Sequence, residues 1–154
     1  MNEKNPISKE LIAPCGMNCA ICSRYLSYTN NLKLSQCIGC RPRNKRCTYL
    51  FKNCLGPRNI SKGNASFCFD CDYYPCKQIN RIDTRYKTNY KMSMKENLEE
   101  IKKVGIDKFI EVQYKKYHCI NCGGLISIHN RMCFKCDTIT RLIEKDNNIT
   151  YTTM

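Results

Sequence analysis

The sequence predicts a small metal-stapled fold, irregular plus α, in which metal–thiolate sites hold short helices and loops together. Three observations lead to this prediction. The chain of 154 residues contains 14 cysteines. Ten of these cysteines fall between residues 13 and 76, where large apolar side chains are sparse, and the other four form two C-x2-C units near the C-terminus. A short chain that lacks apolar area is usually held by disulfides or metals.

The choice between disulfides and metals depends on the compartment, because cytosolic thiols stay reduced while exported thiols oxidise. Residues 1–11 are polar and lack the apolar stretch of an export signal, and no apolar run is long enough to span a bilayer. We therefore expect a soluble, cytoplasmic protein without membrane contact. In that compartment, cysteines in C-x2-C pairs indicate metal ligands.

The net charge of +13 favours a polyanionic partner such as nucleic acid. That count treats every cysteine as neutral, whereas ligating cysteines are thiolates. A zinc ion with four thiolates has a net charge of about −2, so three such sites would lower the +13 to about +7. The remaining positive charge still favours a nucleic-acid partner, but less strongly. The densest basic patch supplies the candidate nucleic-acid-binding residues, which are Arg41, Arg43, Lys45 and Arg46.

Cysteine density divides the chain into four parts. Residues 11–76 form a cysteine-rich metal-binding region, 77–117 a helical segment, 118–137 a zinc ribbon and 138–154 a tail. In the first part we expect loops and one short helix over residues 18–28, with Cys19, Cys22 and Leu26 on one face.

The helical segment shows three apolar stripes. A helix over residues 76–90 would carry Ile79, Ile82 and Tyr86 along one side. Ser93 followed by Glu96 is a capping-box pattern. We interpret the stripes as core rather than as a partner-binding face.

The second predicted helix follows this cap and ends at Gly105, a natural C-terminal stop. Its stripe consists of Met94, Leu98, Ile101 and Val104. The third predicted helix covers residues 107–117, and we expect its inward residues to be Phe109, Val112 and Tyr117.

The four C-terminal cysteines predict a zinc ribbon. Cys119 and Cys122 form one C-x2-C unit, Cys133 and Cys136 form the other, and ten residues separate the two units. Two such turns complete a tetrahedron of thiolates about 2.3 Å from a zinc ion. The intervening residues 125–130 are expected to pair as a short β-hairpin. A site of four thiolates is closed and leaves no position for substrate.

The two histidines flank this ribbon. His118 and His129 could serve as alternative ligands, but four cysteines already complete the site. We therefore expect both imidazoles to be exposed, or to contact the cysteine ligands without binding the metal.

The remaining cysteines are candidate ligands of further sites whose grouping the sequence leaves open. They are Cys15, Cys19, Cys22, Cys37, Cys40, Cys68, Cys71 and Cys76, with Cys47 and Cys54 as less certain members because neither has a near neighbour. Thiolates suit both zinc and iron–sulfur clusters, so ligand type does not separate the two. We expect about three zinc ions per chain, or alternatively one or two [4Fe–4S] clusters plus one zinc.

The spacing of Cys15, Cys19 and Cys22 matches the cluster-binding loop of radical enzymes that use S-adenosylmethionine. Those enzymes need a partial barrel after the motif, and here the next fifty or so residues are loops and further cysteines. The sequence also lacks HExxH, a P-loop and a dinucleotide fingerprint. The sequence therefore argues against an enzyme.

Three blocks of sequence carry a family resemblance. They are Pro14-Cys-Gly-Met-Asn-Cys-Ala-Ile-Cys-Ser-Arg-Tyr25, Cys37-Ile-Gly-Cys-Arg41 and Cys68-Phe-Asp-Cys-Asp-Tyr-Tyr-Pro-Cys76. In order and content they resemble the prokaryotic "domain of unknown function 3795" family over about residues 11–115, and the helix leading into Cys119 resembles members that end in a zinc ribbon. The resemblance implies a cysteine-rich, metal-binding protein with no established reaction.

Two functions stay open at this level. The first is a zinc-built binding or adaptor module for nucleic acid or a protein, although a solvated loop explains the basic patch better than a specific nucleic-acid site does. The second is an iron–sulfur redox or metal-handling protein, with the cluster on the N-terminal cysteines. The sequence identifies neither the partner nor the oligomeric state.

Overall fold

The computed structural model describes residues 5–30, 37–41 and 67–136. Within these ranges the chain forms four α-helices and three short 3₁₀ helices. The α-helices are α1 (Ser23–Thr29), α3 (Lys77–Tyr90), α4 (Met94–Val104) and α5 (Ile106–Tyr117). The 3₁₀ helices are η1 (Lys9–Leu11), η2 (Cys19–Ile21) and η4 (Cys68–Asp70). No described helix has the length and apolar character needed to cross a membrane.

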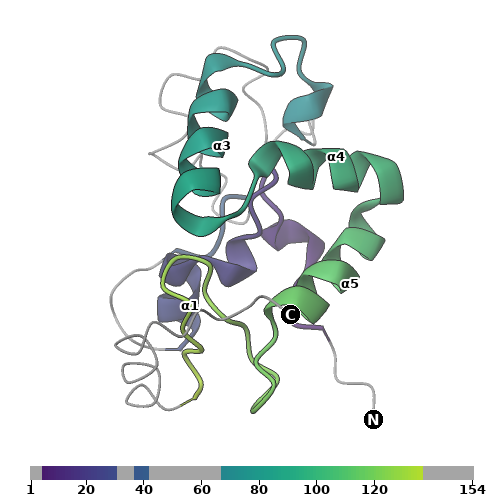
Figure 1. Cartoon of the computed structure of the whole chain (residues 1–154). Helices are drawn as coiled ribbons and strands as arrows, with labels where there is room; N and C mark the ends of the chain where they lie inside the picture. Colours follow the sequence, from purple (N-terminus) through teal and green to yellow (C-terminus); the bar gives the residue numbers. More distant parts are fainter. Residues whose placement is uncertain (1–4, 31–36, 42–66, 137–154) are drawn as a thin grey trace.

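Helices α3, α4 and α5 follow one another and pack in sequence along one side of the molecule (Figure 1). The turn between α3 and α4 is held by Asp83, a buried carboxylate on α3. This carboxylate accepts hydrogen bonds from the Ser93 hydroxyl and from the Lys95 N–H. The Ser93 hydroxyl in turn accepts from the Glu96 N–H at 3.0 Å, so the predicted N-cap of α4 is confirmed.

Gly105 ends α4, as predicted, and also precedes the first residue of α5. It has a φ of +86°. This conformation lets the chain turn sharply between two helices with no intervening loop. The α4 stripe is buried at Met94, Leu98 and Ile101, whereas Val104 at the helix end is 38% exposed.

The inward face of α5 differs from the prediction at one position. Phe109 and Tyr117 are buried, but Val112 is 39% exposed. The polar residue Gln113 takes the inward place and accepts a hydrogen bond from the Asn18 side chain at 3.3 Å. An apolar stripe cannot reveal a buried amide whose partner lies far away in the sequence.

The main core forms around the N-terminal segment. Ile12, Ala20 and Ile21 are fully enclosed and pack with apolar residues of α3, α4 and α5. Leu125 and Ile128, which lie between the two C-terminal C-x2-C units, belong to the same cluster. The cysteine-rich part, the helical segment and the ribbon segment therefore share one apolar core.

The β-hairpin predicted between the C-terminal cysteine pairs is not confirmed, because the described part of the chain contains no strand. The segment makes isolated antiparallel bridges between Ile126 and Cys133 and between His118 and Leu125. Around the turn, the Ser127 N–H donates to the Met132 carbonyl at 2.9 Å. The Arg131 N–H also donates to the Ser127 carbonyl at 2.8 Å, so residues 127–131 form a wide turn and leave few residues on either side of it to pair.

Gly16 fits closely against α4. Its φ is +88°, and an added Cβ would lie 2.8 Å from the Met94 carbonyl oxygen. Its own carbonyl accepts a hydrogen bond from the Asn97 side chain at 2.9 Å. The N-terminal segment can approach α4 this closely only with glycine at position 16.

We therefore predict that Gly16→Ala lowers the free energy of unfolding by about 3 kcal/mol, because it combines backbone strain with a steric clash. The matched control is Gly105→Ala, since Gly105 also has a positive φ but an added Cβ there meets nothing within 4 Å. This control should lose only the strain, about 1–2 kcal/mol. Urea unfolding of the metal-loaded proteins measures both values, and equal losses would contradict the close fit at Gly16.

Candidate metal centre

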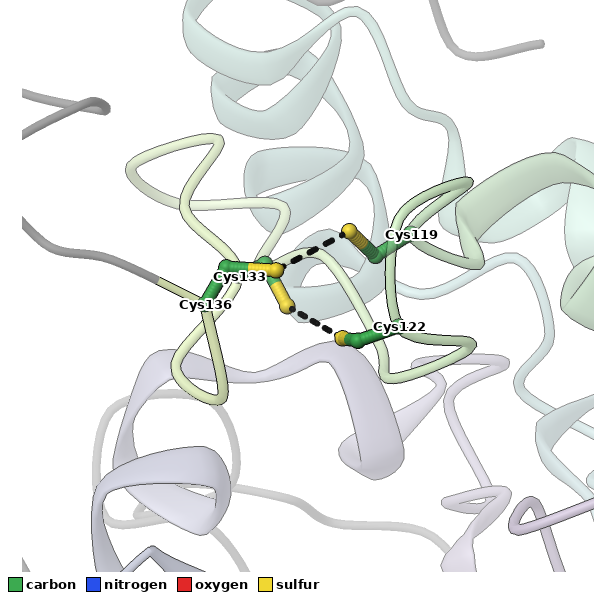
Figure 2. A group of neighbouring side chains, drawn as sticks. All are labelled: Cys119, Cys122, Cys133 and Cys136. Carbon is green, nitrogen blue, oxygen red and sulfur yellow. Dashed lines mark hydrogen bonds between the residues drawn. The ribbon is translucent and has the colours of Figure 1, made fainter.

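Four sulfur atoms meet at the C-terminal end of the described chain. The Sγ atoms of Cys119, Cys122, Cys133 and Cys136 all lie within 4.8 Å of one another. Figure 2 shows the first two cysteines facing the other two across a small gap. The Sγ–Sγ distance is 3.5 Å both for Cys119 with Cys136 and for Cys122 with Cys133. The spacing of the two C-x2-C units thus brings four potential ligands to one point.

The first pair of sulfurs is positioned by a turn directly after α5. The Cys119 N–H donates to the Gly124 carbonyl at 2.6 Å, and the Gly123 N–H donates back to the Cys119 carbonyl at 2.8 Å. Gly123 has a φ of +74°. At Gly124 an added Cβ would lie 3.2 Å from the Cys122 Sγ. The two glycines therefore let the chain double back without crowding the sulfur.

The surroundings of the sulfurs favour a cation. Burial acts to raise the pKa of the Cys119 thiol, but the N–H groups of Cys122 and Asn121 outweigh it, and the pKa is lowered. The neighbouring Cys122 and Cys119 sulfurs raise the pKa of Cys136 strongly. The Cys119 thiol therefore ionises more readily than a free cysteine, whereas the neighbouring sulfurs oppose ionisation of Cys136. A divalent cation between them would relieve that repulsion.

The donor set fits a thiophilic metal ion. Four cysteine sulfurs suit zinc or an iron–sulfur cluster, and the arrangement leaves no free coordination position. The group could therefore hold a metal ion whose identity the geometry does not specify. None of the twelve described cysteines forms a disulfide.

The two histidines lie outside the group of sulfurs. His118 Nδ1 is 3.1 Å from the Tyr114 carbonyl at the end of α5. The half-buried His129 accepts a hydrogen bond at Nδ1 from the Ser23 N–H, 3.2 Å away, so its Nε2–H donates to the Tyr86 hydroxyl at 2.7 Å. His129 therefore joins the ribbon segment to α1 and α3, a role that its position in the sequence does not reveal.

We predict that His129 makes stability depend on pH. Burial lowers its pKa, and the positive charges of Arg24 and Arg85 lower it further. The unfolded chain therefore takes up a proton before the folded chain does. Stability is full above the ordinary histidine pKa of about 6.5 and falls as the pH drops below that value towards the lowered folded pKa.

The measurement is urea unfolding between about pH 7.5 and pH 5.5 on the wild type and on His129→Gln. The glutamine side chain can replace both hydrogen bonds but does not titrate. Any loss of metal at low pH affects both proteins, so the difference between them reports on His129. Parallel curves would contradict a neutral, buried role for this histidine.

The N-terminal cysteines are less tightly grouped. Cys15 and Cys19 are buried in the core, and the half-buried Cys40 hydrogen-bonds to the Cys19 sulfur. This hydrogen bond, with burial second, raises the pKa of Cys19. No other group of three or more potential ligands in the described ranges is as compact as the C-terminal one.

The other predicted ligands have separate positions or are not described. Cys22, Cys37, Cys68, Cys71 and Cys76 are half-buried. The predicted ligands Cys47 and Cys54 lie outside the described residues, as do Arg43, Lys45 and Arg46 of the basic patch.

The remaining member of that patch, Arg41, faces inward. Its Nε donates to the Ile12 carbonyl at 2.7 Å, and its guanidinium lies 4.9 Å from the centre of the Phe67 ring. Burial lowers the pKa of Arg41, while the thiols of Cys15, Cys19, Cys68 and Cys40 act in the opposite direction. Sequence reasoning placed Arg41 among possible nucleic-acid ligands. The only signal for this inward position is that Arg41 directly follows Cys40.

Residues 11–81 match the model of the family described as "Protein of unknown function (DUF3795)". This segment belongs to that family. The DUF3795 segment contains all ten N-terminal cysteines, the whole of α1 and the beginning of α3, while the four C-terminal cysteines lie beyond it. The expected resemblance is thus confirmed, over a shorter range than 11–115. No curated protein and no solved structure matches the chain.

Proposed function

We propose that this protein is a zinc-binding structural metalloprotein that works as a binding or adaptor module. The observation that carries the proposal is the convergence of four cysteine sulfurs from two C-x2-C turns within 4.8 Å. A closed tetrathiolate site stabilises a surface and has no position for a reacting molecule.

The ribbon segment is joined to the rest of the chain by the buried side chains of Leu125 and Ile128 and by hydrogen bonds. It has no strand in its described residues, and its links to the rest of the chain include two backbone hydrogen bonds. The Ile126 N–H donates to the Tyr117 carbonyl at 2.8 Å, and the Ile128 N–H donates to the Ile21 carbonyl at 2.9 Å. A zinc ion would tie residues 119–136 into one unit against the ends of α5 and η2, and its binding free energy would become folding free energy.

The adaptor role rests on what the metal-bound turns would present. Ile120 lies between two ligands and is 73% exposed, the largest value among the large apolar side chains that the structure describes. An apolar side chain on a turn made rigid by metal suits contact with a protein partner, because little conformational entropy is lost on binding. The chain does not identify that partner.

An iron–sulfur protein is the second candidate function. It is favoured by the looser arrangement of the N-terminal thiols, which suits a cluster better than the compact C-terminal group does. Elemental analysis and an optical spectrum of protein purified without oxygen distinguish the two. Zinc alone and no visible absorption support the structural module. A brown protein that contains iron and sulfide supports the alternative.

We predict that Cys122→Ser releases the C-terminal metal ion. Cys122 is the exposed member of the four, so serine costs little packing and the effect reports on ligation. The metal content should fall by one ion per chain, and hydrogen exchange should accelerate in residues 118–136 while α3 and α4 stay protected.

The matched control is His118→Ala, which alters the residue next to Cys119. The His118 imidazole contacts helix carbonyls, so this variant should keep its full metal content. Full metal content in Cys122→Ser would refute the ribbon site. Loss of metal in His118→Ala would instead indicate a histidine ligand.

A further inference from the structure

Four N-terminal cysteines, from three separate parts of the chain, contribute to the electrostatic surroundings of Arg41. Its guanidinium interacts electrostatically with the sulfurs of Cys15, Cys19, Cys68 and Cys40. Two contacts hold the guanidinium in place, the hydrogen bond from its Nε to the Ile12 carbonyl and the stacking on Phe67. Cysteines from three separate parts of the chain therefore act electrostatically on one cation.

Direct contacts bring these cysteines together in pairs. The side chains of Cys19 and Cys40 are hydrogen-bonded, and a backbone hydrogen bond also runs from Cys40 to the Cys19 sulfur. Cys68 reaches the same place through its N–H, which donates to the Pro14 carbonyl at 2.8 Å, directly before Cys15. The three segments 12–19, 40–41 and 67–68 thus meet at one point.

We propose that Cys15, Cys19, Cys40 and Cys68 are the ligands of a second thiolate metal centre, separate from the ribbon. The inference deepens the proposed function and rests on its premise that this chain binds thiophilic metals, but it uses none of the ribbon ligands. It also defines a grouping that spacing alone leaves open. Each of the C-x2-C units at 19–22, 37–40 and 68–71 contributes one ligand, and Cys15 supplies the fourth.

The two cysteines that follow Cys68 have other contacts. The Cys71 sulfur accepts from the Tyr73 N–H at 3.4 Å, and the Cys76 sulfur accepts from the Ile79 N–H at 3.5 Å, where it caps α3. The ribbon ligand Cys122 accepts a similar bond from the Gly124 N–H at 3.4 Å, so these bonds alone do not exclude a sulfur from ligation, and the grouping rests on the contacts of Cys68. Cys68 has its backbone tied to the Pro14 side of the group.

Charge supports the grouping. A zinc ion with four thiolates has a net charge of about −2, and a [4Fe–4S] cluster with four thiolates is also an anion. Cys15 and Cys19 are buried among apolar residues such as Ile12 and Ile21, where an anion is costly without a nearby cation. A guanidinium remains charged at every pH relevant to the protein, so Arg41 can provide that compensation.

The occupant is either a zinc ion or an iron–sulfur cluster, which use the same thiolate chemistry. A zinc ion binds each of its four sulfurs at about 2.3 Å, which requires sulfurs as close together as those of the C-terminal group. The N-terminal group is wider than that, since no three of its ligand atoms lie within 4.8 Å of one another. Zinc would draw the sulfurs inward, whereas a cluster would occupy the wider space.

Paired variants test the grouping, because each C-x2-C unit holds one proposed ligand and one cysteine outside the group. Cys68→Ser should lose the whole N-terminal centre, measured as metal per chain, and keep the ribbon zinc. The double variant Cys19→Ser with Cys68→Ser should lose no more metal than Cys68→Ser alone. Additive loss in this double variant would overturn the grouping.

Cys71→Ser is the matched control for Cys68→Ser. The Cys71→Ser variant should keep the metal of this centre. Introducing Cys68→Ser into that variant should then remove as much metal as Cys68→Ser removes from the wild type. If Cys71→Ser by itself empties the centre that Cys68 serves, the grouping is wrong. Iron, sulfide and visible absorption identify the lost centre as a cluster, and colourless loss of zinc identifies it as a zinc site.

A measurement on the wild type does not depend on the folding of any variant. The half-buried Cys40 and Cys68 should resist alkylation in the metal-loaded protein and become reactive together when a chelator or oxidant removes the N-terminal metal. Rapid alkylation of either one in loaded protein would overturn the inference. If the wild type contains the ribbon zinc and no other metal, the second centre is refuted and the proposed function is not. The ribbon site itself is tested separately by the metal content of Cys122→Ser.

Discussion

The buried segment 12–21 is a part of the chain to which several other described parts attach by hydrogen bonds. Its backbone carbonyls at Ile12, Pro14, Gly16 and Ile21 accept hydrogen bonds from Arg41, Cys68, Asn97 and Ile128, respectively. Its Asn18 side chain donates to Gln113 on α5. These contacts reach the arginine after Cys40, η4, α4, the ribbon segment and α5. An irregular segment can be buried in this way only because its backbone polar groups find partners.

This arrangement explains how one small protein combines an apolar core with cysteine sites. The apolar side chains of segment 12–21 pack under α3, α4 and α5, while Cys15 and Cys19 lie on the same segment. A metal held by those two cysteines would therefore stabilise the centre of the fold. The C-terminal group differs, because Cys119 and Cys133 form a small buried cluster with Ile126, separate from the main core. The two groups thus have different structural consequences for the same ligand chemistry.

Much of the helical part could be predicted because its signals are local. Ser93 and Gly105 mark helix ends through bonds and dihedrals that involve only neighbouring residues. The C-terminal cysteine group could be predicted for the same reason, since each C-x2-C turn positions its own two sulfurs. The prediction was wrong at Val112, where the buried Gln113 has a partner on a distant segment. The predicted hairpin was not confirmed, because residues 127–131 form a turn and the segments beside it pair only through isolated bridges.

The sequence by itself determined the cysteine-rich character of the protein, its three long helices, the family resemblance of residues 11–81 and the four sulfurs of the C-terminal group. Each of these follows from residue types at short spacing, which is information that a linear chain displays directly. Only the tertiary structure decided which way Arg41 faces, how His129 joins three segments and which N-terminal cysteines approach one another. Those features depend on contacts between residues tens of positions apart, and many pairings of ten cysteines satisfy the same spacing. The burial of segment 12–21 places Cys15 and Cys19 in the core, a position that their spacing does not reveal.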